Sequence, residues 1–105
     1  MADAFNKLDT TVLSATSATL VTCGTAAEII IKHIRVVNVT ANTRWFTLYH
    51  DTADAAGTIM YQAPVLAYGW AEFDGSIFLE NSDTIQGYAE AASALTIHIY
   101  GITVT

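Results

Sequence analysis

Charged residues are scarce in this sequence. Lys, Arg, Asp and Glu together make up 13% of its 105 residues, about half of the roughly 25% found in an ordinary soluble domain. Because charged side chains keep the surface of a monomer soluble, we expect part of this surface to be covered by other subunits in an assembly. The alternative is a monomer whose surface is kept in solution by the hydroxyls and amides of Thr, Ser and Asn.

Basic residues are absent from the second half of the chain. The four basic residues are Lys7, Lys32, Arg35 and Arg44. Residues 45–105 hold seven acidic residues, so the formal charge is 4 − 3 = +1 for residues 1–44 and 0 − 7 = −7 for the remainder, which together give the net charge of −6. Since phosphate binding requires clustered Lys and Arg, no nucleic-acid partner is expected.

The sequence also has only one cysteine and no long apolar run. Cys23 has no second cysteine for a disulfide and no metal-ligand spacing around it, so we expect it to be a buried, small apolar residue. The isoleucine run of residues 29–31 ends at Lys32, and no apolar run approaches the roughly 18 residues of a membrane helix. Residues 1–7 lack the apolar stretch of a secretion signal. We therefore expect neither a membrane partner nor export.

Patterns typical of catalytic and metal sites are missing as well. His33, His50 and His98 fall in predicted strands without a metal ligand at short spacing. His50 and Asp54 span a strand end and a turn, so their spacing does not place them on one face. No Gly-x-Ser-x-Gly motif marks a nucleophile, and no glycine-rich loop offers a phosphate site. The sequence predicts no enzyme, no catalytic residue, no cofactor and no metal site.

Alternation of apolar and polar residues predicts β-strands. It is clear in residues 44–49 and again in residues 95–100. In residues 28–39 the apolar phase changes midway, which indicates a bulge or a strand that passes from one sheet to another. Further strands are expected at residues 10–13, 18–23, 58–62, 70–73, 76–79 and 85–89.

Frequent turn signals separate these strands, and helical spacing is weak throughout. Asp74-Gly75 is the best candidate for a two-residue hairpin. About eight short strands joined by turns predict an all-β protein, a single antiparallel β-sandwich that is jelly-roll-like. We expect a short flexible N-terminal arm at residues 1–9 and the β-sandwich domain at residues 10–105. The alternative for the arm is an edge strand along its own sandwich.

Tryptophan and tyrosine are numerous for a chain of this length. Such side chains anchor protein interfaces, and two isolated apolar residues of the arm would gain from burial against a neighbour. The candidate interface residues are Phe5, Leu8, Trp45, Tyr49, Trp70, Tyr88 and Tyr100. Two alternatives are that many of these aromatics belong to the core, or that Trp45 and Trp70 form a sugar-binding platform.

Two segments resemble small virion structural proteins of tailed phages. The first consists of residues 34–40 and 45–51, a strand, a turn and a strand. The second consists of residues 77–89 and 95–101, where a strand, an acidic turn, a short strand and a last strand follow one another. The resemblance extends over residues 28–104 and implies a β-sandwich that decorates or cements a capsid, or that belongs to the neck or tail. The chain departs from the pattern in its Ala-rich loops and in the missing proline at the entry to the hairpins.

Resemblance and composition together predict a capsid decoration protein, also called a cement protein, on the outer surface of a phage virion. Its expected partners are itself, as a homo-oligomer and in particular a trimer, and the major capsid protein or other virion proteins. The acidic second half suits the outside of a particle better than contact with a packaged genome. Synthesis in the host cytoplasm is expected. The alternatives are a tail, neck or baseplate component and a carbohydrate-binding module for host attachment.

Overall fold

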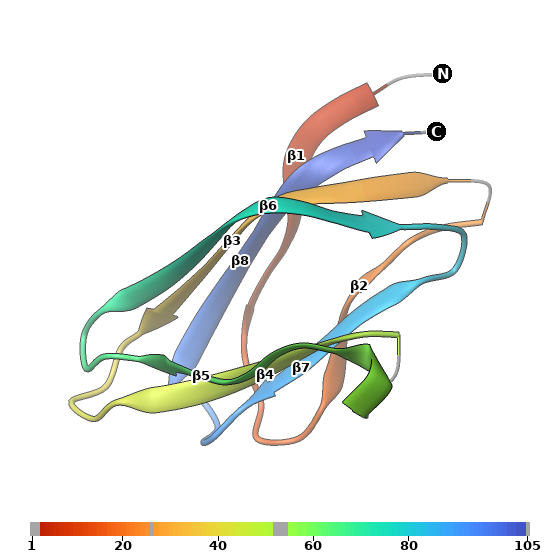
Figure 1. The fold of residues 1–105 in the computed structure, drawn as a ribbon. Coiled ribbons are helices and arrows are strands. Elements are labelled where there is room, and N and C mark those ends of the chain that lie inside the picture. The colour runs from red at the N-terminus through yellow and green to blue at the C-terminus, as the bar shows by residue number, and fades with distance from the viewer. Residues whose placement is uncertain (1–2, 26, 52–54, 105) are drawn as a thin grey trace.

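Two four-stranded β-sheets face each other across an apolar core (Figure 1). The computed structural model describes residues 3–25, 27–51 and 55–104. The elements are β1 (Asp3–Val12), β2 (Ala18–Thr22), β3 (Glu28–Asn38), β4 (Arg44–His50), the short 3-10 helix η1 (Ala55–Gly57), β5 (Thr58–Val65), β6 (Trp70–Leu79), β7 (Thr84–Ala89) and β8 (Leu95–Val104). Among the described residues, no helix has the length and apolar character needed to cross a bilayer.

The strand order is that of a jelly roll. Sheet A runs β1-β8-β3-β6 and sheet B runs β2-β7-β4-β5, with every neighbouring pair antiparallel. The pairs β1 with β8, β2 with β7, β3 with β6 and β4 with β5 are therefore nested, as when one long hairpin is rolled up into two facing sheets. The predicted all-β antiparallel sandwich of about eight strands is confirmed.

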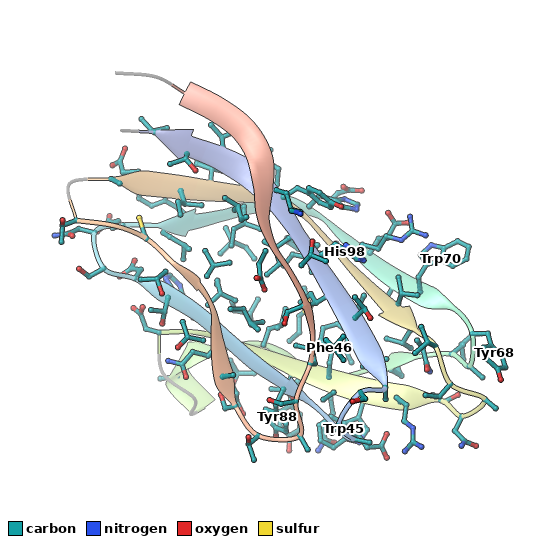
Figure 2. All side chains as sticks on the ribbon, turned by 180° about the vertical axis from the view of Figure 1, so that it is seen from behind. Trp45, Phe46, Tyr68, Trp70, Tyr88 and His98 are labelled. Carbon is teal, nitrogen blue, oxygen red and sulfur yellow. The ribbon has the colours of Figure 1, made fainter. Side chains whose placement is uncertain are left out.

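The core forms where the alternation predicts it. On β8, Leu95, Ile97 and Ile99 are fully buried, and on β4 the side chains of Phe46 and Leu48 are 2% and 0% exposed. Phe46 lies between the two sheets (Figure 2). Burial of a side chain of this size stabilises the folded state by about 1.5–3 kcal/mol, so the inward residues of these two strands hold the sheets together.

Strand β3 changes its inward face halfway along. Ile29 and Ile31 are buried in its first half, and Ile34 and Val36 in its second half. The register against both β6 and β8 shifts between Ile31 and His33. An extra residue at such a bulge exchanges the two faces of a strand. The predicted bulge is confirmed, and β3 stays in sheet A along its whole length.

The predicted hairpin at Asp74-Gly75 is wrong. Both residues lie within β6, one unbroken strand where the sequence predicts two. The register of β6 against β3 shifts next to Asp74, and the ring of Phe73 lies so near Gly75 that a Cβ there would be 2.9 Å from it. The Asp-Gly pair therefore lies at a bulge in a continuous strand and does not form a turn.

The N-terminal segment also differs from the prediction. β1 begins at Asp3 and pairs with β8 along its length, whereas the sequence predicts an arm over residues 1–9. Residues 3–9 are thus part of an edge strand, which is the alternative given above. The physical reason is that β8 would otherwise leave a row of backbone groups without partners. Leu8 lies at a register shift in this pairing and packs against the core.

Candidate functional site

The outer face of sheet A gathers side chains of all four of its strands. Strand pairing sets them side by side in three rows, each crossing β1, β8, β3 and β6 in that order. The first row is Lys7, Tyr100, His33 and Asp74, the second is Thr10, His98, Arg35 and Glu72, and the third is Val12, Thr96, Val37 and Trp70. All twelve residues are exposed or half-buried. We call this surface the outer face; its members His98 and Trp70 are labelled in Figure 2.

His33 is held between two carboxylates of β6. Its Nδ1 lies 2.6 Å from an oxygen of Asp74, and its Nε2 lies 3.0 Å from an oxygen of Glu72. Each ring nitrogen therefore lies within hydrogen-bonding distance of one carboxylate oxygen. The bulge in β3 turns His33 outward and makes this contact possible. The result is that both acidic side chains have fixed positions on the outer face.

Arg35 and Trp70 form a second ordered contact on the outer face. The Cζ of Arg35 lies 5.1 Å from the ring centroid of Trp70, within the range of a cation–π interaction. The Nε1 of Trp70 donates a hydrogen bond to Glu72 at 3.1 Å. Trp70 is nevertheless 59% exposed. Its ring therefore offers apolar area to a partner in an orientation that is already set.

The outer face carries no net charge. Lys7 and Arg35 balance Glu72 and Asp74, which gives 2 − 2 = 0 with neutral histidines, in a chain whose net charge is −6. The rest of the protein therefore carries all of the excess negative charge. The outer face is thus a surface whose own residues do not repel another acidic molecule on balance.

A second aromatic cluster lies on sheet B. The rings of Trp45 and Tyr88 meet edge to face with centroids 5.8 Å apart, and Tyr49 stacks on Tyr88 at 6.3 Å. Because Trp45 belongs to sheet B and Trp70 to sheet A, the structure does not bring together the two tryptophans of the expected sugar-binding platform (Figure 2).

The remaining interface candidates have different surroundings. Tyr100 lies half-buried on the outer face, where its ring stacks parallel to that of His98 at 6.5 Å. Tyr49 is only 9% exposed and belongs to the interior. Leu8 packs partly buried against the protein's own core, and the side chain of Phe5 lies outside the described residues.

Sequence reasoning missed the charged members of the outer face. His33, Arg35, Glu72 and Asp74 become neighbours only because β3 pairs with β6, and no local pattern reveals that pairing. The one available signal was the phase change in β3, which determines that His33 and Arg35 share the outward side after the bulge.

Another group of polar side chains lies at one end of sheet B. His50, Asp51 and Asp83 each place one potential ligand atom within 4.8 Å of the others. The Nε2 of His50 is 3.4 Å from Asp83, whose same oxygen accepts a hydrogen bond from the backbone N–H of Glu80 at 2.9 Å. This backbone hydrogen bond and His50 hold the pKa of the Asp83 carboxyl below its usual value. Imidazole and carboxylate donors at such spacing are of the kind that bind zinc.

The sequence did not predict this group. The partner considered for His50 in the sequence was Asp54, whose spacing did not place the two on one face, and Asp54 lies outside the described residues. The pairing of β4 with β7 instead places His50 opposite Ile85, near Asp83. In the structure the carboxylates act as turn caps: besides the contact of Asp83 with Glu80, an oxygen of Asp51 accepts the backbone N–H of Thr84 at 2.8 Å.

An apolar cavity of about 190 Å³ opens between β5 and β6, the edge strands on the same side of the sandwich. It is lined by Ile34, Val36, Phe46, Met60, Ala63, Ala71, Glu72 and Phe73. An apolar cavity of about 150 Å³ accommodates one benzene ring, so this space is large enough for a single aromatic side chain.

No family model matches the sequence, and no curated protein matches it. Solved structures do match the fold. A protein of Bacillus endospore appendages, reported as disulfide-linked pili, matches with a TM-score of 0.56 and 18% identity over 98% of this chain and 88% of that chain. The Drosophila NLP core, reported with pentamer formation and histone binding, matches with a TM-score of 0.55 and 13% identity over 99% and 98%.

The coat protein of Tobacco streak virus is a third structural match. Its TM-score is 0.51 and its identity 9%, over 98% of this chain and 85% of that chain. At these identities the likeness shows the fold, an eight-stranded sandwich also present in viral coat and pilus proteins. The structural class is thereby defined, and the role of the chain has to be argued from its own surface.

Proposed function

We propose that this chain is a structural subunit of a virion, and that it acts as a capsid decoration protein through protein–protein contacts and without catalysis. The observation that carries the proposal is the uncovered outer face of sheet A. It presents the exposed Val12 and Trp70 together with fixed charged groups, which is the mixture of aromatic anchor and polar surroundings typical of protein interfaces.

The structural matches support this class of role. The pili, the pentamer and the viral coat protein are each named for an assembly of many subunits. A jelly roll suits such assemblies because its two sheets form a rigid body whose outer faces are free for contacts. The low charge of the chain supports the same role, since a surface with few charges costs less to desolvate.

The mechanism would be mechanical. Copies on the outside of a shell bury surface against each other and against capsid subunits, which stabilises the shell against internal pressure. Each contact is weak, but a shell repeats it many times. The acidic remainder of the surface would face solvent, away from the genome, whose phosphates repel it. A trimer at three-fold positions and a tail, neck or baseplate location stay predictions of the sequence.

The experiment compares particles with and without the protein. Particles that lack it are expected to release their genome at a lower temperature, and addition of the purified chain should restore the wild-type value. The Glu90→Gln variant, changed at an exposed residue outside the outer face, should restore it equally well. Unchanged particle stability together with a specific signal on a glycan array would reject decoration in favour of host attachment.

A further inference from the structure

We propose that two copies of this chain pair through the outer face of sheet A, related by a two-fold axis that runs parallel to the strands between β8 and β3. This inference rests on the proposed function, because it names the partner of the surface on which that function depends. It makes the contact a symmetric dimer, in place of the trimer that a three-fold position calls for.

The pairing of rows follows from the axis. Rotation about a line parallel to the strands keeps each row at its own height and lays β1 of one copy over β6 of the other. Lys7 then faces Asp74 of the second copy, and Val12 faces Trp70. The exposed fractions of Val12 and Trp70 are 53% and 59%, so each has apolar area to bury. A cation therefore meets an anion, and an apolar side chain meets an aromatic ring, twice in every dimer.

A two-fold axis perpendicular to the strands, in the plane of the sheet, would give poor contacts. Rotation about a line perpendicular to the strands lays each strand over itself and exchanges the first and third rows. Arg35 would then face Arg35 of the second copy, Glu72 would face Glu72, and Lys7 would face Val12. Like charges directly opposite each other and charges buried against apolar groups both cost free energy. The residue pattern thus selects the parallel axis.

Charge also favours a second copy as the occupant. Two chains of net charge −6 repel each other in most orientations. The outer face is neutral and carries its positive groups, Lys7 and Arg35, on β1 and β3, while its negative groups, Glu72 and Asp74, both lie on the edge strand β6. After the two-fold rotation the cationic edge strand β1, with Lys7, lies over the acidic edge strand β6, with Asp74, on both sides of the axis. An unrelated partner would not require such a pattern.

The area of the face bounds the strength of the dimer. Four strands about 4.8 Å apart and six residues at about 3.4 Å give a footprint of roughly 400 Å², about half of the roughly 800 Å² per partner in a standard interface. Sheets that pack face to face lie about 10 Å apart, a spacing at which their side chains interdigitate. We expect a weak dimer, which calls for measurements up to several hundred micromolar.

The test exchanges charges across the contact. Lys7→Glu alone and Asp74→Lys alone each place like charges opposite each other in both halves of the dimer. The dissociation constant of each variant should therefore rise at least roughly tenfold. An equimolar mixture of the two variants should recover dimer, because opposite charges then meet at both contacts. Sedimentation equilibrium measures all three samples, and Glu90→Lys is the control that should dimerise at least as well as the wild type.

A second variant guards against misfolding. Asp74→Lys also removes a partner of His33, so circular dichroism and thermal melting must show that it is folded. Val12→Asp leaves that cluster intact. Val12 is an exposed residue of an edge strand, and the substitution should weaken the dimer by placing a carboxylate against Trp70.

Three results would overturn the proposal: a trimer, a wild-type chain that stays monomeric, or a mixture of the two charge variants that fails to recover dimer.

The two proposals fail in different ways. A chain that stabilises shells but stays monomeric in solution contradicts the two-fold contact and leaves decoration intact. A chain that dimerises and responds to the charge exchange, yet does not change shell stability, contradicts decoration and leaves the contact intact.

Discussion

The side-chain amide of Asn38, at the end of β3 in sheet A, donates a hydrogen bond to the backbone carbonyl of Val65, at the end of β5 in sheet B, with a donor–acceptor distance of 3.0 Å. The same amide donates to the carbonyl of Asn42 at 2.8 Å, and its oxygen accepts from the backbone N–H and the hydroxyl of Thr40. Asn38 is 1% exposed and both ends of its amide have partners, so one side chain joins the two sheets where the core ends.

Asn38→Ala should therefore destabilise the protein by about 2–4 kcal/mol, because it leaves buried backbone groups without partners and creates a small cavity. Chemical denaturation measures the change. Asn42→Ala is the matched control, since its side chain is exposed and a surface change of this kind usually alters stability by no more than about 0.5 kcal/mol. Equal stabilities of the two variants would contradict the linking role of Asn38.

Gly101 should not tolerate a side chain. A Cβ at this position would collide with the carbonyl oxygen of Ile30 and come within 3.0 Å of Ile31 Cα and of a Leu8 methyl group. We expect Gly101→Ala to cost about 1–3 kcal/mol, the range for an overpacked interior. At Gly24 a Cβ would meet nothing within 4 Å, so Gly24→Ala is the control and should melt close to the wild type. A neutral Gly101→Ala would mean that β3 and β8 are less closely spaced than the structure has them.

Asp9 should make stability depend on pH in the direction opposite to most acidic residues. It pairs with Ile99, a core residue, and its Oδ2 is buried with no hydrogen-bond partner among the described residues. Desolvation by burial raises the pKa of its carboxyl, partly offset by a hydrogen bond from the backbone of Thr10. A folded-state pKa above the unfolded value means that the folded state is favoured when Asp9 is protonated, and that this stability is lost as the pH rises through the folded pKa.

Asp9→Asn should accordingly raise the melting temperature at pH 7, where the wild type carries a buried carboxylate. The gain should shrink as the pH falls through the raised folded-state pKa of Asp9, and it should be lost below roughly 4, where the wild-type carboxyl is neutral in both states. Thermal melts of both proteins across this range provide the measurement, with Glu90→Gln as the exposed control. A lower melting temperature of Asp9→Asn at pH 7 would show that the carboxylate has a stabilising partner.

The Cys23 thiol should be inert in the folded protein. It is 1% exposed, and burial, followed by the nearby charges of Asp83 and Glu28, raises its pKa. Thiolate is the reactive form, so a thiol reagent should modify Cys23 only as fast as the protein unfolds. The rate with a chromogenic disulfide reagent, with and without denaturant, tests this. Rapid modification under native conditions would indicate that the end of β2 opens readily.

The sequence predicts this fold well where one strand face decides the outcome. Residues 95–100 alternate strictly, and Leu95, Ile97 and Ile99 are buried as expected. The prediction from sequence fails where pairing with a neighbouring strand determines the structure. Asp74-Gly75 has the composition of a turn, but pairing with β3 keeps the strand continuous. Residues 3–9 have little apolar pattern of their own, and they form a strand because they pair with β8.

The candidate site was less accessible from sequence for the same reason. The aromatic residues Trp70 and Tyr100 were identified as interface candidates, because aromatic side chains are informative by type alone. Their neighbours His33, Arg35 and Glu72 were not, since Glu72 comes 37 positions after Arg35, the residue that it faces across the ladder. Strand order has to be known before such a surface can be assembled.

The nested strand order has a consequence for how the chain reaches its native state. The sheet partner of β1 is β8, and Asp3 lies opposite Val104, so closing this ladder brings together segments from far apart in the sequence. Contacts of such long sequence separation cost loop entropy before they contribute enthalpy, and domains built from them fold in milliseconds to seconds. During synthesis on the ribosome, β1 has to wait for β8 to emerge. Meanwhile its unpaired edge can associate with other nascent chains, so production of this protein should respond strongly to translation rate and to chaperones that shield exposed strands.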